Sequence, residues 1–350
     1  MPQTVFEIKY IKSYNVFSRN SEDEMRRICL IATGGTIACV QTERGLAPKL
    51  AARDLLSYIG GDTGGIDCID LFSMDSSNIQ PEEWQQIASC IDGIRPKYDA
   101  IVLTHGTDTM AYTSSMLSFM LRGIDIPVII TGAQYPIVRE DSDGRKNLRD
   151  AVTAARMIGG GVYICFGGII ISGCRAVKTR TTSLDAFESI NTPPVCTVEG
   201  DEVCYVNAAA SLSHYSFSPK IDPRVALIKL IPGTSPEILD SLAACGMRGV
   251  VVEAFGLGGV HSFRRDHTES LIRLMEKGIT VILASQCLYE ASTPDIYEVS
   301  RPLKDAGIIP AYDMTTEAAV TKLMWVLGQT SNRAKIREMM LTNLCGELRA

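Results

Sequence analysis

The 350 residues carry 34 lysines and arginines against 40 aspartates and glutamates, a formal net charge of −6. This balance, with no Lys/Arg-rich run, argues against nucleic acid as the main partner, because neutralising phosphates needs clustered cations. The hydrophobic fraction of 46% is typical of a soluble, well-cored protein, and the length suits about two domains. No apolar stretch approaches the ~18–20 residues of a membrane span, so we expect no membrane partner.

The first 27 residues lack the apolar core of a signal peptide and end in charges, which predicts an ill-ordered extension on a cytoplasmic protein. The eleven cysteines are spaced at least eight residues apart and mostly lie in apolar runs, as Cys29 and Cys165 do. We interpret them as reduced, small hydrophobic residues. The histidines form no His/Cys cluster, so the sequence predicts no metal site: His105, His214, His261 and His267.

Short β-rich runs alternate with amphipathic segments, the pattern of an α/β fold built on a parallel sheet. The Gly-rich run 161–173 is interpreted as buried sheet. In chain order we expect a strand at 28–33, a helix at 81–94, a strand at 100–104, a helix at 111–123, a strand at 127–131 and a helix at 147–158.

The alternation lapses at about 190–224, where Pro, Ser and Asn occur without a helical period. It then resumes and closes with a helical segment at about 315–344. We therefore predict two α/β domains, the second smaller than the first. Their expected boundaries are an extension at 1–27, a catalytic domain at 28–205, a linker at 206–223 and a C-terminal domain at 224–350.

Two loops follow predicted strands at the carboxyl edge, where open parallel sheets bind ligands. The first reads Thr33-Gly34-Gly35-Thr36. Its glycines permit a sharp turn and leave room for a ligand beside the Thr36 hydroxyl. A glycine turn that binds phosphate, or a simple tight loop, is the alternative interpretation.

The second loop, residues 105–109, reads His-Gly-Thr-Asp-Thr and precedes a predicted helix. Helix capping by Thr107, Asp108 or Thr109 is the simplest explanation, since these residue types are the usual caps. Capping does not explain why a His-Gly pair comes first.

Together the loops favour acyl transfer from a small amino-acid amide. A threonine hydroxyl needs an adjacent base or proton relay to act as a nucleophile, and backbone N–H groups at strand ends are suited to an oxyanion. Asp108 is suited to a cationic group of the substrate. Lys178 is the candidate base, although a solvated charged loop is the simpler interpretation of its surroundings.

Seven segments resemble the bacterial-type L-asparaginases, and the run LTHGTDTMAYTSSMLSFML at 103–121 resembles their cytoplasmic type I branch most. The resemblance runs in order over about residues 28–348. The segments are ATGGTIA (32–38), MDSSNI (74–79), LTHGTDTMAYT (103–113), IITGAQYP (129–136), SDGRKNLRDA (142–151), AVKTRTTSLDAF (176–187) and NLCGEL (343–348).

This resemblance implies an L-asparagine amidohydrolase that releases L-aspartate and ammonia through a covalent β-aspartyl intermediate, with no metal or organic cofactor. Thr36 matches the family's nucleophile, and Thr107, Asp108 and Lys178 match its second catalytic constellation. The substrate would be bound by Gly35, Asp75, Ser76, Ser77, Gly106, Thr107, Asp108 and the backbone carbonyl of Ala133. The implied assembly is a homotetramer or homodimer of two-domain subunits.

The sequence departs from the family pattern at two positions. Leu46 stands where relatives commonly place a tyrosine that hydrogen-bonds the nucleophile. Gly259 stands where many carry an asparagine that reaches the neighbouring subunit's substrate, and Tyr289 or Glu290 is a candidate substitute.

Three alternatives stay open at this point. The chain could act on glutamine as well, since one methylene changes binding by only ~1–3 kcal/mol. It could be an amino-acid sensor with a degenerate site, although a sensor needs only the binding groups. It could also be an amidohydrolase subunit of a transamidosome, but the 27 residues before the first strand are too few for the additional N-terminal domain expected there.

Overall fold

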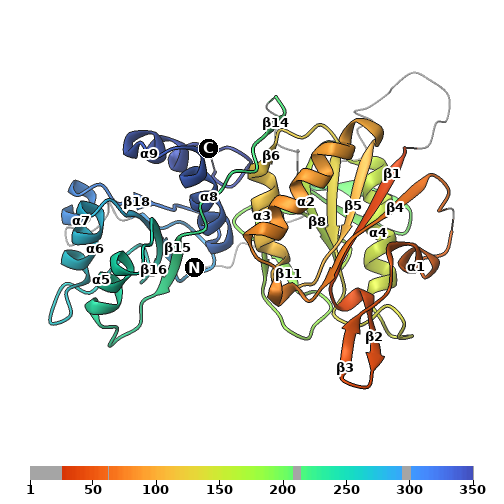
Figure 1. The fold of residues 1–350 in the computed structure, drawn as a ribbon, viewed down its shortest axis with the longest axis horizontal. Helices are drawn as coiled ribbons and strands as arrows, with labels where there is room; N and C mark the ends of the chain where they lie inside the picture. Colours follow the sequence, from red (N-terminus) through yellow and green to blue (C-terminus); the bar gives the residue numbers. More distant parts are fainter. Residues whose placement is uncertain (1–25, 62, 208–213, 294–300, 350) are drawn as a thin grey trace, which may run out of the picture. The chain divides into compact units, whose positions relative to one another are not determined.

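The computed structural model describes residues 26–61, 63–207, 214–293 and 301–349. The predicted extension, apart from Arg26 and Arg27, and part of the predicted linker lie outside the described residues. The fold divides into two units, each with its own sheet (Figure 1). The first comprises residues up to Ser114 together with Gly123–Tyr215, and the second comprises Ser115–Arg122 together with the chain from Ser216.

The first unit is built on an eight-stranded sheet in the order β13-β12-β9-β8-β7-β5-β1-β4. The neighbours from β8 to β4 run parallel, as the sequence predicts, whereas β9, β12 and β13 run antiparallel at one edge. The bounds are β1 Ile28–Gly34, β4 Ile66–Met74, β5 Ala100–Thr104, β7 Pro127–Thr131, β8 Gly161–Phe166, β9 Ile169–Ser172, β12 Cys196–Glu199 and β13 Glu202–Tyr205.

Helices cover the parallel strands because their side chains are apolar on both faces. Ile28, Leu30 and Val102 belong to a buried cluster with residues of α1 (Ala52–Ser57) and α4 (Gly144–Met157). The alternate residues of β1 and β5 point to the opposite face. The helices α2 (Pro81–Ile94) and α3 (Met110–Met120) precede and follow β5 and are themselves rich in buried apolar residues.

Two helix boundaries differ from the sequence expectation. The helix expected at 111–123 ends at Met120, because Leu121–Arg122 forms a short strand, β6, that pairs with β14 (Ser216–Phe217). Pairing with a strand this remote in the sequence leaves no local signal. Helix α4 begins at Gly144, three residues earlier than expected.

The second unit has a parallel four-stranded sheet in the sequential order β15-β16-β17-β18. The predicted two-domain α/β architecture is therefore confirmed. The strands are Val225–Lys229, Gly249–Ala254, Thr280–Ser285 and Ile309–Pro310, and the helices are α5 Pro236–Ala244, α6 His267–Glu276, α7 Arg301–Asp305, α8 Thr316–Gln329 and α9 Arg333–Leu341. No helix among the described residues is long and apolar enough to cross a bilayer.

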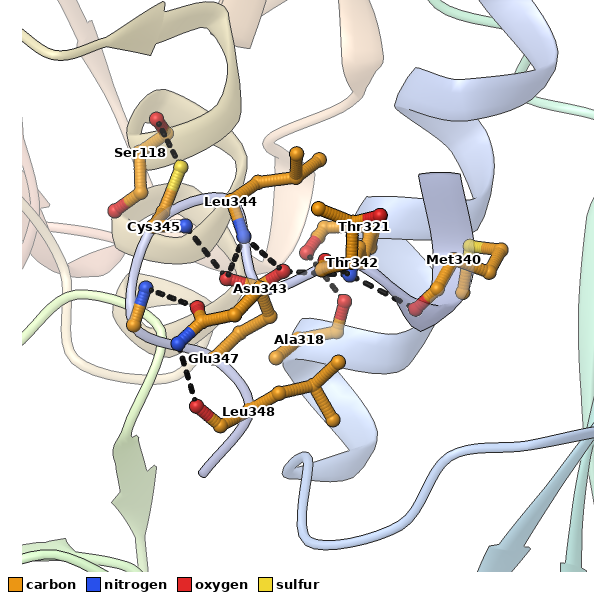
Figure 2. Close-up of polar contacts among 12 residues, drawn as sticks. Ser118, Ala318, Thr321, Met340, Thr342, Asn343, Leu344, Cys345, Glu347 and Leu348 are labelled. Atoms are coloured by element: carbon orange, nitrogen blue, oxygen red, sulfur yellow. Dashed lines mark hydrogen bonds and ion pairs between the residues drawn. The ribbon is translucent and has the colours of Figure 1, made fainter. Parts of the chain in front are cut away.

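The NLCGEL segment is a structural element of the second unit, and its Glu347 and Leu348 are buried. Figure 2 shows the polar contacts of this segment. The Glu347 carboxylate accepts hydrogen bonds from the backbone of Leu344 and Cys345 and lies 2.5 Å from the Lys322 ammonium of α8. Both charged side chains are fully buried. Lys322 also donates to the carbonyls of Met340 and Thr342, at 2.9 and 2.7 Å. This motif therefore fastens the end of the chain to α8 and α9.

Candidate active site

Four strand ends meet at the carboxyl edge of the first sheet. In the ladder Ala32 of β1 lies beside Thr104 of β5, and Thr104 lies beside Thr131 of β7. On the other side Gly34 lies beside Met74 of β4. The loops that follow these strands are therefore neighbours, and they contain most of the residues predicted from sequence.

The first loop passes very close to the second. Gly35 has φ of +77°, and a Cβ added there would collide with the backbone of Gly106. Its N–H donates to the Met74 carbonyl at 2.9 Å. Glycine is therefore required for this backbone approach. Thr36 follows as the first residue of the short helix η1 (Thr36–Ala38), with its side chain half-buried.

The loop after β4 forms the short helix η2 (Ser76–Asn78). The Asp75 carboxylate caps it, accepting from the Ser77 hydroxyl at 2.7 Å and the Ser77 N–H at 2.8 Å, and these bonds lower the pKa of Asp75. Ser76 is buried, and a Cβ on Gly106 would collide with its side chain. Of these three predicted binding residues, Ser76 thus lies directly against the second loop.

The second loop meets Lys178, which is 71 residues beyond Thr107 along the chain. Lys178 ends β10 (Ala176–Lys178), which pairs with β11 (Phe187–Ser189). Its ammonium donates to the Thr107 hydroxyl at 2.8 Å and to the Asp108 carboxylate at 2.7 Å. The lysine side chain is 16% exposed and the Asp108 side chain 64%, whereas Thr107 is buried, so only the carboxylate of this linked group is open to solvent.

The loop after β7 carries the buried Ala133 and a residue that sequence reasoning missed, Gln134. The Gln134 amide donates to the carbonyls of Thr181 and Ser183, both at 3.1 Å, and its oxygen lies 3.4 Å from the Thr107 hydroxyl. It thereby ties the segment after Lys178 to the second loop. The one feature of the sequence that pointed to Gln134 is its place in IITGAQYP (129–136), a segment that resembles the asparaginase family.

Asp143 is a second residue that was missed. Its carboxylate accepts from the backbone N–H groups of Gln134, at 2.9 Å, and Tyr135, at 3.0 Å. Asn147 donates both to this carboxylate and to the Gly132 carbonyl, at 3.0 Å each. These bonds hold the backbone on both sides of Ala133 in place.

The structure also locates the departures from the family pattern. Leu46 lies on β3 (Gly45–Pro48), which forms a hairpin with β2 (Cys39–Thr42), and it is 57% exposed. No described side chain hydrogen-bonds the Thr36 hydroxyl. In the second unit Gly259 forms an isolated bridge with Phe255, and the exposed Glu290 has φ of +74°.

A hydroxyl on a glycine turn, whose backbone touches the loop of a second hydroxyl linked to an ammonium and a carboxylate, is suited to acyl transfer. One hydroxyl can attack, while the linked groups handle a proton and a charged substrate group. A cavity of about 280 Å³ in the second unit, lined by Ile279, Ile309 and Arg337 among others, contains none of these residues.

Comparison with known proteins bears on this interpretation. The family model for the asparaginase N-terminal domain matches residues 27–211, and that for the glutaminase/asparaginase C-terminal domain matches residues 224–340. The chain belongs to the asparaginase family. Both halves of the fold are thus those of an asparaginase.

Solved asparaginases resemble the chain over nearly its whole length. It is 41% identical to the L-asparaginase of Thermococcus kodakarensis, covering 92% of this chain and 99% of that one, and the structures superpose with a TM-score of 0.88. L-asparaginase I of Vibrio cholerae is 30% identical, with a TM-score of 0.80 and coverage of 93% and 100%.

Asparaginase-family relatives of another kind are also similar. A glutamyl-tRNA(Gln) amidotransferase subunit from Methanosphaera stadtmanae is 35% identical over 93% of this chain, which matches 77% of the length of that relative. The fold is therefore shared by relatives with two different names, and the choice between them rests on the site.

Proposed function

We propose that the chain hydrolyses L-asparagine to L-aspartate and ammonia. The observation that carries the proposal is the link from Lys178 to both Thr107 and Asp108, on loops whose backbones touch at Gly35 and Gly106. This arrangement gives a second proton-handling hydroxyl beside the loop that bears Thr36. A sensor with a degenerate site would need only groups that bind the carboxylate and the ammonium.

In the proposed mechanism the Thr36 hydroxyl oxygen attacks the side-chain amide carbon, and its proton passes to a base. The carbon–nitrogen bond then breaks, and ammonia leaves with a proton, which gives a β-aspartyl ester on Thr36. Water, activated by Thr107 and Lys178, cleaves the ester to L-aspartate. Backbone N–H groups of the two loops stabilise the oxyanion, a contribution of roughly 3 kcal/mol for each donor.

Substrate binding in this proposal uses the neighbouring loops. Asp108 holds the α-ammonium, and Ser76, with Gly35 and Gly106, faces the α-carboxylate. The Ala133 carbonyl faces the side-chain amide. In this proposal Asp75 and Ser77 hold the backbone around Ser76 in place, because the Ser77 N–H and hydroxyl both donate to the Asp75 carboxylate.

The decisive measurement is ammonia release from L-Asn, D-Asn and L-Gln over a wide range of concentrations. We expect turnover of L-Asn well above that of L-Gln, with weak L-Gln turnover allowed by the ~1–3 kcal/mol that one methylene contributes. Binding of L-Asn without any ammonia release would favour the sensor instead. Equal L-Gln turnover would indicate a mixed asparaginase/glutaminase.

Replacing Lys178 with methionine is expected to lower kcat by about 10²–10⁴-fold, because the Thr107 hydroxyl loses its proton partner. Lys178→Arg is the matched variant, since it keeps the charge but cannot readily give up its proton. Both should lose activity, and the pH–rate profile of Lys178→Met should lose the limb that depends on the base. A profile with the wild-type shape would argue against Lys178 as the base.

We also propose that the enzyme belongs to the cytoplasmic type I branch and assembles as a homotetramer or homodimer. The likeness to the Vibrio cholerae L-asparaginase I supports the branch, and a neighbour from Campylobacter jejuni is named as a probable cytoplasmic L-asparaginase, with 26% identity. Light scattering of the purified chain measures the assembly directly.

A further inference from the structure

The second loop begins with the pair His105-Gly106, and the proposed mechanism assigns no role to His105. His105 is fully buried, and burial lowers the pKa of its imidazole to about 4, so the ring is neutral near pH 7. Its two nitrogens each have one partner: Nδ1 lies 2.7 Å from the Gly106 carbonyl, and Nε2 lies 3.0 Å from the Thr113 hydroxyl. The Trp84 indole N–H in turn reaches that hydroxyl, at 2.9 Å.

The chemistry of these partners fixes the position of every proton in the hydrogen-bonded chain that runs from Trp84 through Thr113 to His105. The Gly106 carbonyl only accepts, so Nδ1 must carry the hydrogen, and a neutral ring then leaves Nε2 as an acceptor. Thr113 must therefore donate its hydroxyl hydrogen to Nε2. The indole N–H only donates, and it fills a lone pair of the same hydroxyl. Trp84, Thr113 and His105 are all buried, so no alternative pairing with bulk water competes.

The hydrogen-bonded chain ends at a peptide bond of the candidate active site, the one between Gly106 and Thr107. The Gly106 carbonyl and the Thr107 N–H belong to one planar trans peptide and point in opposite directions. Because the carbonyl is bound to His105, the Thr107 N–H points away from the buried imidazole. No described residue accepts this N–H. Gly106 itself is pressed between Ser76 and Gly35, so the peptide has little freedom once its carbonyl is held.

We infer that Trp84, Thr113 and His105 form a proton-ordered chain that positions the Gly106–Thr107 peptide, so that the Thr107 N–H is a preoriented donor to the oxyanion. His105 is a positioning residue and does not touch the substrate. The catalytic part of this inference rests on the proposed asparagine hydrolysis, whereas the proton order does not.

Neutron diffraction on crystals of the deuterium-exchanged full chain tests the proton order without any substrate. We expect a deuteron on Nδ1 of His105, none on Nε2, and the Thr113 deuteron directed at Nε2. A deuteron on Nε2, or on both nitrogens, would overturn the inference. This measurement keeps its meaning even if the chain releases no ammonia from asparagine.

Kinetics tests the positioning. Thr113→Val keeps the side-chain shape but removes the hydroxyl, and we expect kcat to fall about tenfold or more while KM stays within about threefold, since an oxyanion donor acts mainly in the transition state. Thr113→Ser restores the hydroxyl and should keep kcat within about threefold of the wild type. A purely structural defect would not show this rescue together with an unchanged KM.

A second variant decides the matter if Thr113→Val does not fold. Trp84→Phe keeps an aromatic ring but loses the indole N–H, and we expect a smaller loss of kcat, about two- to fivefold, again at nearly constant KM. Circular dichroism confirms that each variant is folded. Wild-type kcat in the folded variants would overturn the positioning role.

Discussion

Replacing Thr36 with alanine is expected to lower kcat for L-asparagine by about 10³–10⁴-fold and to leave substrate binding nearly unchanged. The variant loses the attacking oxygen, whereas the Asp108 and Ser76 side chains, which are assigned to the substrate's charged ends, lie on other loops. Gly35 and its bond to the Met74 carbonyl persist, so the loop should keep its shape. Steady-state kinetics and calorimetric titration with L-asparagine give the two quantities separately.

The matched control is Thr36→Ser, which keeps a hydroxyl at the same position and should keep measurable turnover. Mass spectrometry of acid-quenched enzyme provides an additional readout, because the β-aspartyl ester should be found on residue 36 in the wild type and not in the alanine variant. Wild-type-like turnover in Thr36→Ala would end its assignment as the nucleophile.

Replacing Lys322 with methionine should have the largest effect on stability. The substitution leaves the fully buried Glu347 carboxylate without its cation, and breaking a buried ion pair in this way costs about 3–5 kcal/mol. The carbonyls of Met340 and Thr342 lose their donor as well. Urea unfolding of the variant and the wild type measures the difference.

Two further variants separate the buried pair from general surface effects. Adding Glu347→Gln to Lys322→Met removes the buried charge but keeps an oxygen for the N–H groups of Leu344 and Cys345, so part of the stability should return. Lys335→Ala breaks an exposed pair with Glu338 and should change stability by less than about 1 kcal/mol. If Lys322→Met were as mild as Lys335→Ala, the buried pair would contribute little.

The elements were predictable where the sequence pattern is local. The strand 100–104 and the helix 81–94 are found with the predicted bounds, because a short apolar run and an N-terminal proline are strong local signals. The end of α3 was not predictable. Its residues are buried on nearly every side, and the short strand that follows depends on a partner at Ser216–Phe217.

The candidate site, like the secondary structure, was predictable where the signal is local and not where it depends on remote partners. The two loops are visible in sequence because each follows a strand at the binding edge of the sheet. The residues that were missed are those whose partners are remote: Gln134 meets Thr181, and Trp84 meets Thr113, only because the strand order brings their elements together. The roles of Thr36, Thr107, Asp108 and Lys178 stay predictions until the variants are measured.

The division of the chain into two units limits where the protein can be split into separately expressed fragments. The chain passes into the second unit at Ser115, returns at Gly123 and enters it again at Ser216. A gene split between the two family domains would therefore leave Ser115–Arg122 in the first fragment, although these residues belong to the second unit. We therefore expect that neither fragment folds stably when it is expressed alone. Activity should return only when the two fragments are co-expressed and associate.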